Sequence, residues 1–197
     1  MILIKLLNVT KKYKNRLIIK NSSFEIDSKT SYILIGENGT GKTTIIKIII
    51  GLVNLTSGSI QKNSDNIGYL PDKCLLPNHI TIKSFLELFH KKNKLIETYL
   101  KEWGLYEHKD KKVNNLSKGM FQKLMIINML LKEEELYILD EPLNGLDEIS
   151  QKKFFSKIIS LKKQKKSIIV ATHFPKLYKK YFDRVLKIEN GEIIIYS

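Results

Sequence analysis

The segment Gly36-Glu-Asn-Gly-Thr-Gly-Lys-Thr43 constrains the fold of this chain more than any other part of the sequence. It matches the pattern G-x-x-x-x-G-K-[ST], and it lies between an apolar run that ends at Ile35 and a helical pattern that begins after Lys42. Glycines let backbone N–H groups turn around an anion, and the N-terminus of the following helix adds positive potential. The segment therefore predicts a phosphate-binding loop between a strand and a helix, rather than an ordinary glycine turn.

Within this loop, two side chains have separate expected tasks. We expect Lys42 to reach the β- and γ-phosphates of a nucleotide and the Thr43 hydroxyl to bind magnesium. The other predicted nucleotide-binding residues are Gly36, Glu37, Asn38, Gly39, Thr40, Gly41 and Thr44.

A second chemical motif follows the apolar run 136–139. This run reads as a buried strand, and it ends in Asp140 and Glu141. An acid at the end of such a strand is typical of a Walker B motif, in which the aspartate holds magnesium. Glu141 is then placed to orient or deprotonate an attacking water. Many buried strands end in acidic turns, so this pattern alone is weak evidence. It indicates a Walker B motif because a phosphate-binding loop lies upstream.

The remaining patterns predict an α/β fold. Short β-rich runs fill the first thirty-five residues, and strands alternate with helices farther along the chain. Apolar residues at helical spacing predict helices over 82–89, 95–103 and 149–163, and another after Ser117 as a possible N-cap. The runs 184–188 and 192–196 predict a hairpin around Asn190-Gly191. We therefore expect an α/β core with an antiparallel β addition.

Taken in order, these motifs resemble the nucleotide-binding subunit of ATP-binding cassette (ABC) transporters over nearly the whole chain. The resemblance implies a P-loop NTPase core of ABC-ATPase type, with an N-terminal antiparallel β subdomain and a short helical subdomain. It implies one domain over 1–197, with residues 1–72 and 116–197 as the catalytic core and 73–115 as the helical subdomain.

The resemblance also implies roles for residues outside the two motifs. Tyr13 looks like the aromatic that stacks on adenine, although a surface strand tyrosine is the simpler interpretation. The segment Leu116-Ser-Lys-Gly-Met120 resembles the family signature LSGGQ, from which Lys118 and Met120 depart. In the family this loop comes from the opposite subunit, and its serine and glycine bind the γ-phosphate. Ser117 and Gly119 match those roles, although Ser117 could be only a helix cap.

Two further positions complete the predicted site. His173, after the apolar run 168–172, looks like the histidine that contacts the γ-phosphate, and we expect it to be catalytic together with Glu141. A histidine after a strand is otherwise more often structural. Asp72 stands where the family usually has a magnesium-contacting glutamine. Aspartate can ligate magnesium, but its side chain is one methylene shorter, so Asp72 could also be only a turn residue.

The function implied by the resemblance is ATP hydrolysis that powers transport. The cofactors are ATP and Mg²⁺, and the partners are an integral membrane transporter subunit and a head-to-tail dimer mate, either a second copy or another ATPase. The LS-x-G-M variant of the signature indicates an exporter of peptides or drugs. The most apolar stretch, 45–53, is too short to cross a bilayer. We therefore expect a peripheral protein at the cytoplasmic face of the cell membrane.

The net charge of +14 leaves an alternative open. It could indicate an ABC-type ATPase that acts on nucleic acid or ribosomes without a membrane subunit. However, only Arg16 and Arg184 carry the guanidinium that base readout favours, and lysines lie along the whole chain. In a P-loop kinase or GTPase the signature segment would have no role. The presence of both Glu141 and His173 argues against a protein that binds ATP without hydrolysing it. Nucleic acid is therefore not the favoured partner.

Overall fold

The computed structural model of this protein describes residues 1–77, 79–91 and 93–196. The chain forms two compact units: one from 1–69, 134–141 and 158–197, here called the sheet unit, and one from 70–133 and 142–157, here called the helical unit. Asn78 and Lys92, within the expected subdomain 73–115, and Ser197 lie outside the described residues. The two units are distinguished by how densely their backbones pack and not by function. The boundaries of the helical subdomain at 73–115 therefore stay a prediction.

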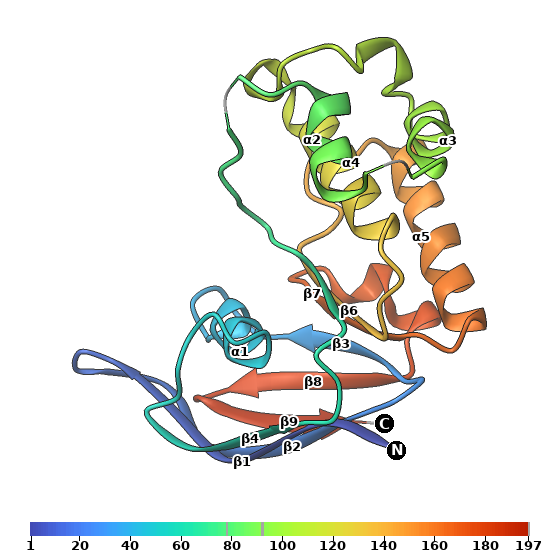
Figure 1. Ribbon diagram of the computed structural model, residues 1–197. Coiled ribbons are helices and arrows are strands. Elements are labelled where there is room, and N and C mark those ends of the chain that lie inside the picture. The colour runs from blue at the N-terminus through green and yellow to red at the C-terminus, as the bar shows by residue number, and fades with distance from the viewer. Residues whose placement is uncertain (78, 92, 197) are drawn as a thin grey trace. The chain divides into compact units, whose positions relative to one another are not determined.

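The larger sheet has the strand order β5-β6-β7-β3-β8-β9 (Figure 1). The central strand β3 pairs in parallel with β7 on one side and β8 on the other, while β8 and β9 form an antiparallel hairpin whose last pair, Glu189 and Glu192, encloses the predicted turn. The strands β3, β6 and β7 are almost wholly buried, as expected for parallel strands. Their bounds are β3 Ser31–Ile35, β5 Ile67–Leu70, β6 Leu136–Asp140, β7 Ser167–Ala171, β8 Arg184–Glu189 and β9 Glu192–Tyr196.

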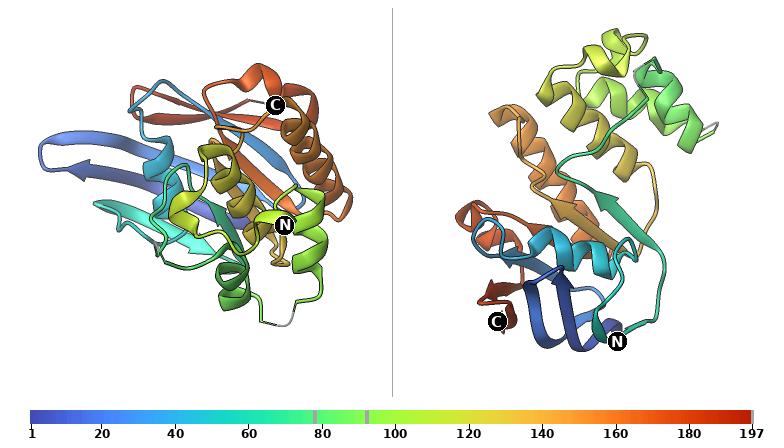
Figure 2. Two further views of the ribbon diagram at one scale, coloured as in Figure 1. Left: turned by 90° about the horizontal axis from the view of Figure 1, so that it is seen from above. Right: turned by 90° about the vertical axis from the view of Figure 1, so that its left-hand side faces the viewer.

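The smaller sheet is antiparallel, with the order β2-β1-β4. The short β-rich runs expected in the first part of the chain join here into two long strands, β1 (Ile2–Tyr13) and β2 (Arg16–Asp27). The pairing of β1 with β2 contains several register shifts, and these let polar residues interrupt the alternation of apolar and polar residues without ending either strand. The third strand, β4 (Ser57–Lys62), pairs with β1. Figure 2 shows the blue hairpin of β1 and β2 as an extended ribbon within the sheet unit.

The two sheets of this unit are joined at β2 and β9. Lys20 N–H donates to the carbonyl oxygen of Gly191 at 2.7 Å, and Ile193 N–H donates to the Ser22 hydroxyl oxygen at 3.2 Å. These contacts connect residues about 170 positions apart in the chain.

The helix α1 (Lys42–Ile49) is fixed by four buried isoleucines. These side chains share one hydrophobic cluster with residues of both sheets, so α1 packs between the antiparallel sheet and the parallel one. Burial of each isoleucine contributes about 1.5–3 kcal/mol, which holds the start of α1 in place against the end of β3. The four residues are Ile45, Ile46, Ile48 and Ile49.

The helical unit is built mainly from α2, α3, α4 and the first turns of α5 (Figure 1). Thr81 caps α2 by accepting from Ser84 N–H, and Ser117 caps α4 by accepting from Met120 N–H at 3.2 Å. The predicted helices and the predicted α/β class with an antiparallel addition are confirmed. In the part of the chain that the structure describes, no helix has the length and apolar character to cross a membrane. The bounds are α2 Ile82–Phe89, α3 Leu95–Glu102, α4 Lys118–Leu130 and α5 Glu148–Lys163.

Candidate functional site

The predicted phosphate-binding loop connects the end of β3 to the start of α1. Gly39 and Gly41 have φ angles of 79° and 112°, in the region that favours glycine. A Cβ atom on Gly41 would lie 2.8 Å from Ile18 Cγ2, and one on Gly36 would lie 2.6 Å from Thr40 Oγ1. The loop is therefore a tight backbone turn, and the first N–H groups of α1, which have no partner within the helix, follow directly after it.

The ammonium group of Lys42 lies inside this turn. Lys42 is 8% exposed, and its Nζ donates to the carbonyl oxygens of Gly36 at 2.8 Å and Glu37 at 3.1 Å. The side chains of Glu37 and Asn38 are exposed, while Thr44 is half-buried on the first turn of α1. A buried cation beside a helix N-terminus gives positive potential at this turn, which suits a phosphate group.

The hydroxyl of Thr43 meets the carboxylate that ends β6. Thr43 Oγ1 donates to Asp140 Oδ2 at 2.7 Å, and Asp140 is 2% exposed. Two oxygen ligands side by side fit Mg²⁺, which binds proteins through few carboxylates and takes its other ligands from phosphates and water. No group of three or more His, Cys, Asp or Glu side chains among the described residues could hold a metal ion. The pair therefore fits a magnesium ion that arrives with a nucleotide.

The carboxylate of Glu141 is held from two sides. Its Oε1 lies 2.8 Å from His173 Nδ1, and its Oε2 accepts from the Thr172 hydroxyl at 3.3 Å. Glu141 has a φ angle of 50°, which is costly for a residue with a side chain, and its N–H donates to the Ala171 carbonyl at 2.9 Å. This conformation turns the chain away from β6 and directs the carboxylate toward the end of β7.

A cavity of about 440 Å³ brings the loop and the histidine together. Gly36, Glu37 and Asn38 line it from the phosphate-binding loop, and Thr172 and His173 line it from the end of β7. The ring of Phe174 packs on the His173 imidazole with 3.8 Å between centroids. Anion-binding groups and a carboxylate–imidazole pair thus occupy one region, an arrangement that suits hydrolysis of a phosphoanhydride.

Tyr13 ends β1, and 43% of its surface is exposed. The Lys11 ammonium lies 4.6 Å from its ring centroid. Tyr13 pairs across the hairpin with Arg16, whose Nη2 lies 3.5 Å from the Gly39 carbonyl oxygen. Sequence reasoning missed Arg16 as a neighbour of the loop. The only available signal was that it is one of two arginines in a lysine-rich chain.

In the helical unit, the predicted signature segment packs on the turn that precedes α5. Ser117 caps α4, and a Cβ atom on Gly119 would lie 2.6 Å from the Gly145 carbonyl oxygen. A glycine is therefore required sterically at position 119. Lys118 and Met120, which depart from the family pattern, are exposed and half-buried, respectively.

Further contacts from α4 secure the same turn. Gln122 Nε2 donates to the Pro142 carbonyl at 2.9 Å in a buried position, and Lys123 Nζ lies 2.9 Å from Asp147 Oδ2. Asp147 Oδ1 accepts from Ser150 N–H at 2.8 Å. The hydrogen bond from Lys123, followed by those from Ser150, lowers the pKa of Asp147 well below its ordinary value. Gln122 and Lys123 were not singled out from the sequence, because their role depends on the turn folding onto α4.

Asp72 also contacts this turn. Its Oδ1 accepts from Asn144 Nδ2 at 2.9 Å, and both side chains are half-buried. Asp72 therefore makes more than the local contacts of a turn residue, and its predicted contact with magnesium stays a prediction.

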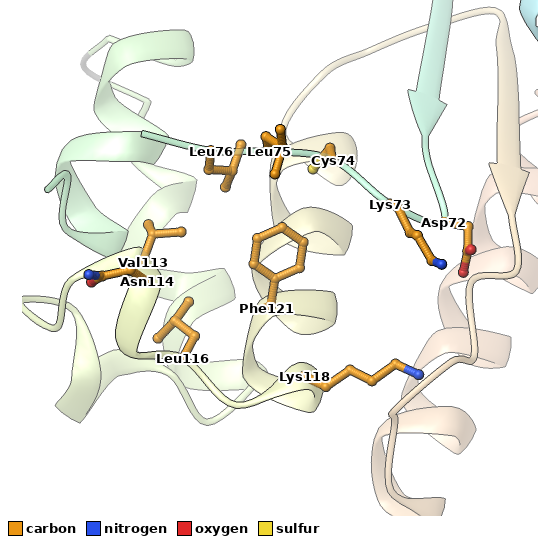
Figure 3. Close-up of a pocket in the computed structure, with 10 residues that line it drawn as sticks. All are labelled: Asp72, Lys73, Cys74, Leu75, Leu76, Val113, Asn114, Leu116, Lys118 and Phe121. Carbon is orange, nitrogen blue, oxygen red and sulfur yellow. The ribbon is translucent and has the colours of Figure 1, made fainter. Parts of the chain in front are cut away.

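A second cavity, of about 430 Å³, lies in the helical unit beside Asp72. Figure 3 shows Phe121 and Leu116 on one side of it and the segment from Asp72 to Leu76 along the other. Leu75 is fully exposed, while the Cys74 thiol lies 3.9 Å from the Met125 sulfur. The cavity therefore has apolar walls and charged groups at one end.

Comparisons with known proteins show the family to which this chain belongs. The family model described as ABC transporter matches residues 19–144. The zinc import ATP-binding protein ZnuC of Rickettsia bellii is 42% identical over 83% of this chain and 72% of that protein. The chain belongs to the ABC transporter family.

Two further similarities extend over almost the whole chain. The uncharacterized ABC transporter ATP-binding protein MJ1023 of Methanocaldococcus jannaschii is 31% identical over 98% of this chain and 77% of that protein. A solved structure of an ATP binding subunit of an ABC transporter is 26% identical, has a TM-score of 0.90, and covers 99% of this chain and 90% of that one. The predicted ABC-type P-loop NTPase core is confirmed.

As a member of this family, the ABC ATPase binds ATP with Mg²⁺, hydrolyses ATP and works with a membrane transporter component. Magnesium would be held by Thr43 and Asp140, where it neutralises phosphate charge. The expected drug or peptide exporter type is not supported, because the relative at 42% identity is named for import. Nothing supports the alternative of an ATPase that acts on nucleic acid or ribosomes.

Proposed function

We propose that this ABC ATPase powers the import of a divalent metal ion, with zinc as the first candidate. The 42% identity to a zinc import ATP-binding protein carries this proposal. The LS-x-G-M signature, which indicated an exporter, is a weaker guide because it rests on two positions, whereas the identity extends over 171 residues.

Within this function, we assign the nucleotide's phosphates to Lys42 and the loop N–H groups. Glu141 acts as the base that orients or deprotonates the attacking water, and His173 holds its carboxylate and contacts the γ-phosphate. The 2.8 Å contact between these two side chains supports this division. Tyr13 receives the adenine ring, with the neighbouring Arg16 near the loop.

The working form is a head-to-tail dimer, with itself or with a second ATPase chain. Ser117 and Gly119 contribute the hydroxyl and the backbone amide that bind the γ-phosphate of the mate's nucleotide. The cap geometry supports this role, because it points the positive end of α4 toward the exposed Ser117. A helix of the membrane subunit docks at the cavity beside Asp72, and its apolar walls suit such a partner (Figure 3). The protein is therefore peripheral at the cytoplasmic face of the cell membrane.

The test is metal uptake in the native cell. Glu141→Gln replaces the carboxylate by a neutral amide of the same shape, so we expect uptake of radioactive zinc to fall to the level of a strain without the gene. A tagged wild-type chain should also co-purify from membranes with one multi-spanning protein. Normal zinc uptake together with increased drug sensitivity in the Glu141→Gln strain would overturn import in favour of export.

A further inference from the structure

The segment after β7 brings a buried tyrosine to the far side of the residues that hold Glu141. Pro175–Leu177 forms a short 3₁₀ helix, and Tyr178 follows it with its N–H bonded to the Pro175 carbonyl at 3.0 Å. Tyr178 is 1% exposed, and its ring packs edge-on to Phe182 with 5.8 Å between centroids. Its hydroxyl is hydrogen-bonded to the Thr172 side chain.

The hydrogen-bonding capacity of Thr172 fixes the direction of each contact. A hydroxyl has one proton to donate and two lone pairs that accept. The Glu141 carboxylate can only accept, so Thr172 donates its proton to Oε2, at 3.3 Å. Phe174 N–H donates to Thr172 Oγ1 at 3.1 Å, which occupies one lone pair. The remaining lone pair accepts from Tyr178, so the order of donation runs from Tyr178 to Thr172 to Glu141.

Tyr178 keeps its proton at any pH the protein experiences. Burial, and then the negative charge of Glu141, raise the pKa of Tyr178 far above its ordinary value. A protonated phenol keeps an O–H group that can donate to Thr172. Because the Glu141 carboxylate has no proton to donate, the Thr172 proton lies toward Oε2 while Tyr178 donates to Thr172.

We propose that Tyr178 is a positioning residue for ATP hydrolysis, which acts through the Thr172 hydroxyl to hold one oxygen of the Glu141 carboxylate. His173 holds the other oxygen, so the carboxylate is fixed in rotation and presents a defined lone pair to the attacking water. Tyr178 is buried and acts only through Thr172 in this arrangement. This inference rests on the proposed role of Glu141 as the base.

The test is single-turnover ATP hydrolysis, with the purified chain and its co-purified membrane partner in excess over ATP, so that slow reactions remain measurable. Tyr178→Phe removes the hydroxyl and keeps the ring. We expect the hydrolysis rate at saturation to fall roughly fivefold, as for one hydrogen bond, with the affinity for ATP unchanged. The matched control is Tyr32→Phe, which removes another buried tyrosine hydroxyl, one that accepts from Asp27 N–H at 2.9 Å. This control should hydrolyse ATP at the wild-type rate.

A double-mutant cycle separates positioning from general destabilisation. Thr172→Val removes the link, so adding Tyr178→Phe to it should cause no further loss of rate. A Tyr178→Phe rate within 1.5-fold of wild type, or equal losses in the two backgrounds, would overturn the proposal. Glu141→Gln is measured in parallel: if that variant keeps its activity, the proposed role of Glu141 is wrong. If it loses activity and Tyr178→Phe does not, only the positioning role is wrong.

Discussion

Asn144 donates a hydrogen bond of 2.9 Å to the carboxylate of Asp72, so the turn before α5 is attached to the segment that lines the cavity of the helical unit. The family's glutamine at this place would carry its amide one methylene farther from the backbone. In this chain the shorter Asp72 instead has a defined partner.

Changing one member of this pair should destabilise the helical unit, and exchanging the two residues should restore its stability. Asn144→Asp places two carboxylates in contact, and we expect the free energy of unfolding of the helical unit to fall by about 1–2 kcal/mol. The double variant Asp72→Asn, Asn144→Asp restores a donor opposite an acceptor and should recover most of this loss. Urea denaturation followed by fluorescence reports this unit directly, because the chain's one tryptophan, Trp103, is buried there. A double variant as unstable as the sum of the singles would contradict the contact.

Removal of the buried ammonium of the phosphate-binding loop should weaken ATP binding. For Lys42→Ala we expect a roughly 10- to 100-fold higher Kd, because a charge-assisted contact with phosphate is lost. Lys47→Ala, on the last turn of the same helix, is the matched control and should bind as wild type does. Titration with a fluorescent ATP analogue, with and without EDTA, measures both the lysine and the magnesium contribution. Equal affinities for the two lysine variants would refute the assignment.

Gly119 and Gly104 should respond differently to the same substitution. A Cβ atom at 119 meets the Gly145 carbonyl oxygen at 2.6 Å, whereas at 104 nothing lies within 4 Å and only the φ angle of 68° opposes it. Gly119→Ala must shift the signature segment, so we expect at least a tenfold loss of ATPase activity and about 1–3 kcal/mol of stability. Gly104→Ala should lose about 1 kcal/mol and keep its activity. An active Gly119→Ala would show that the close approach is not needed.

Acid should selectively weaken the contacts of Asp183 in the sheet unit. Burial tends to raise the pKa of Asp183, but hydrogen bonds from Ser31 and Lys162 outweigh it, so its pKa is lowered on folding. Its stabilising contribution is therefore complete above the unfolded value, about 3.9, and is lost as the pH falls through the lower folded value. We expect Asp183→Asn to cost roughly 1 kcal/mol at pH 7, because the carboxylate is half-exposed, and much less at pH 2.5. Urea denaturation followed by circular dichroism at both pH values tests this, and a difference that does not shrink in acid would contradict it.

Local chemistry made most of the fold and part of the site predictable. The conformation of the loop from Gly36 to Thr43 was predictable, because the glycines that allow the turn and the helix that follows it are contiguous in sequence. The cap at Ser117 and the hairpin at Asn190 were predictable for the same reason. The length of β1 and β2 was not, since bulges let polar residues interrupt the alternation without ending the strands.

Contacts between distant segments escaped sequence reasoning. The support that Thr172 and Tyr178 give to Glu141 depends on β6 and β7 pairing in parallel, which brings Asp140 opposite Ala171. Arg16 reaches the loop only because the first hairpin folds across it. The direction of transport was not predictable from the sequence, for another reason. The LS-x-G-M variant of the signature indicated an exporter. A loop that binds nucleotide, however, does not determine what the membrane partner transports or in which direction.

The bonds that join β2 to β9 have a consequence for synthesis. Ser22 leaves the ribosome long before its partner Ile193, 171 residues later. At about 5–20 residues per second, that interval is roughly 10–30 s. Throughout it, the outer edge of β2 is an open strand that could pair with another nascent chain. Lys20 and the bulges along β1 and β2 disfavour pairing of that edge with a second strand. They therefore reduce aggregation of the chain during its synthesis.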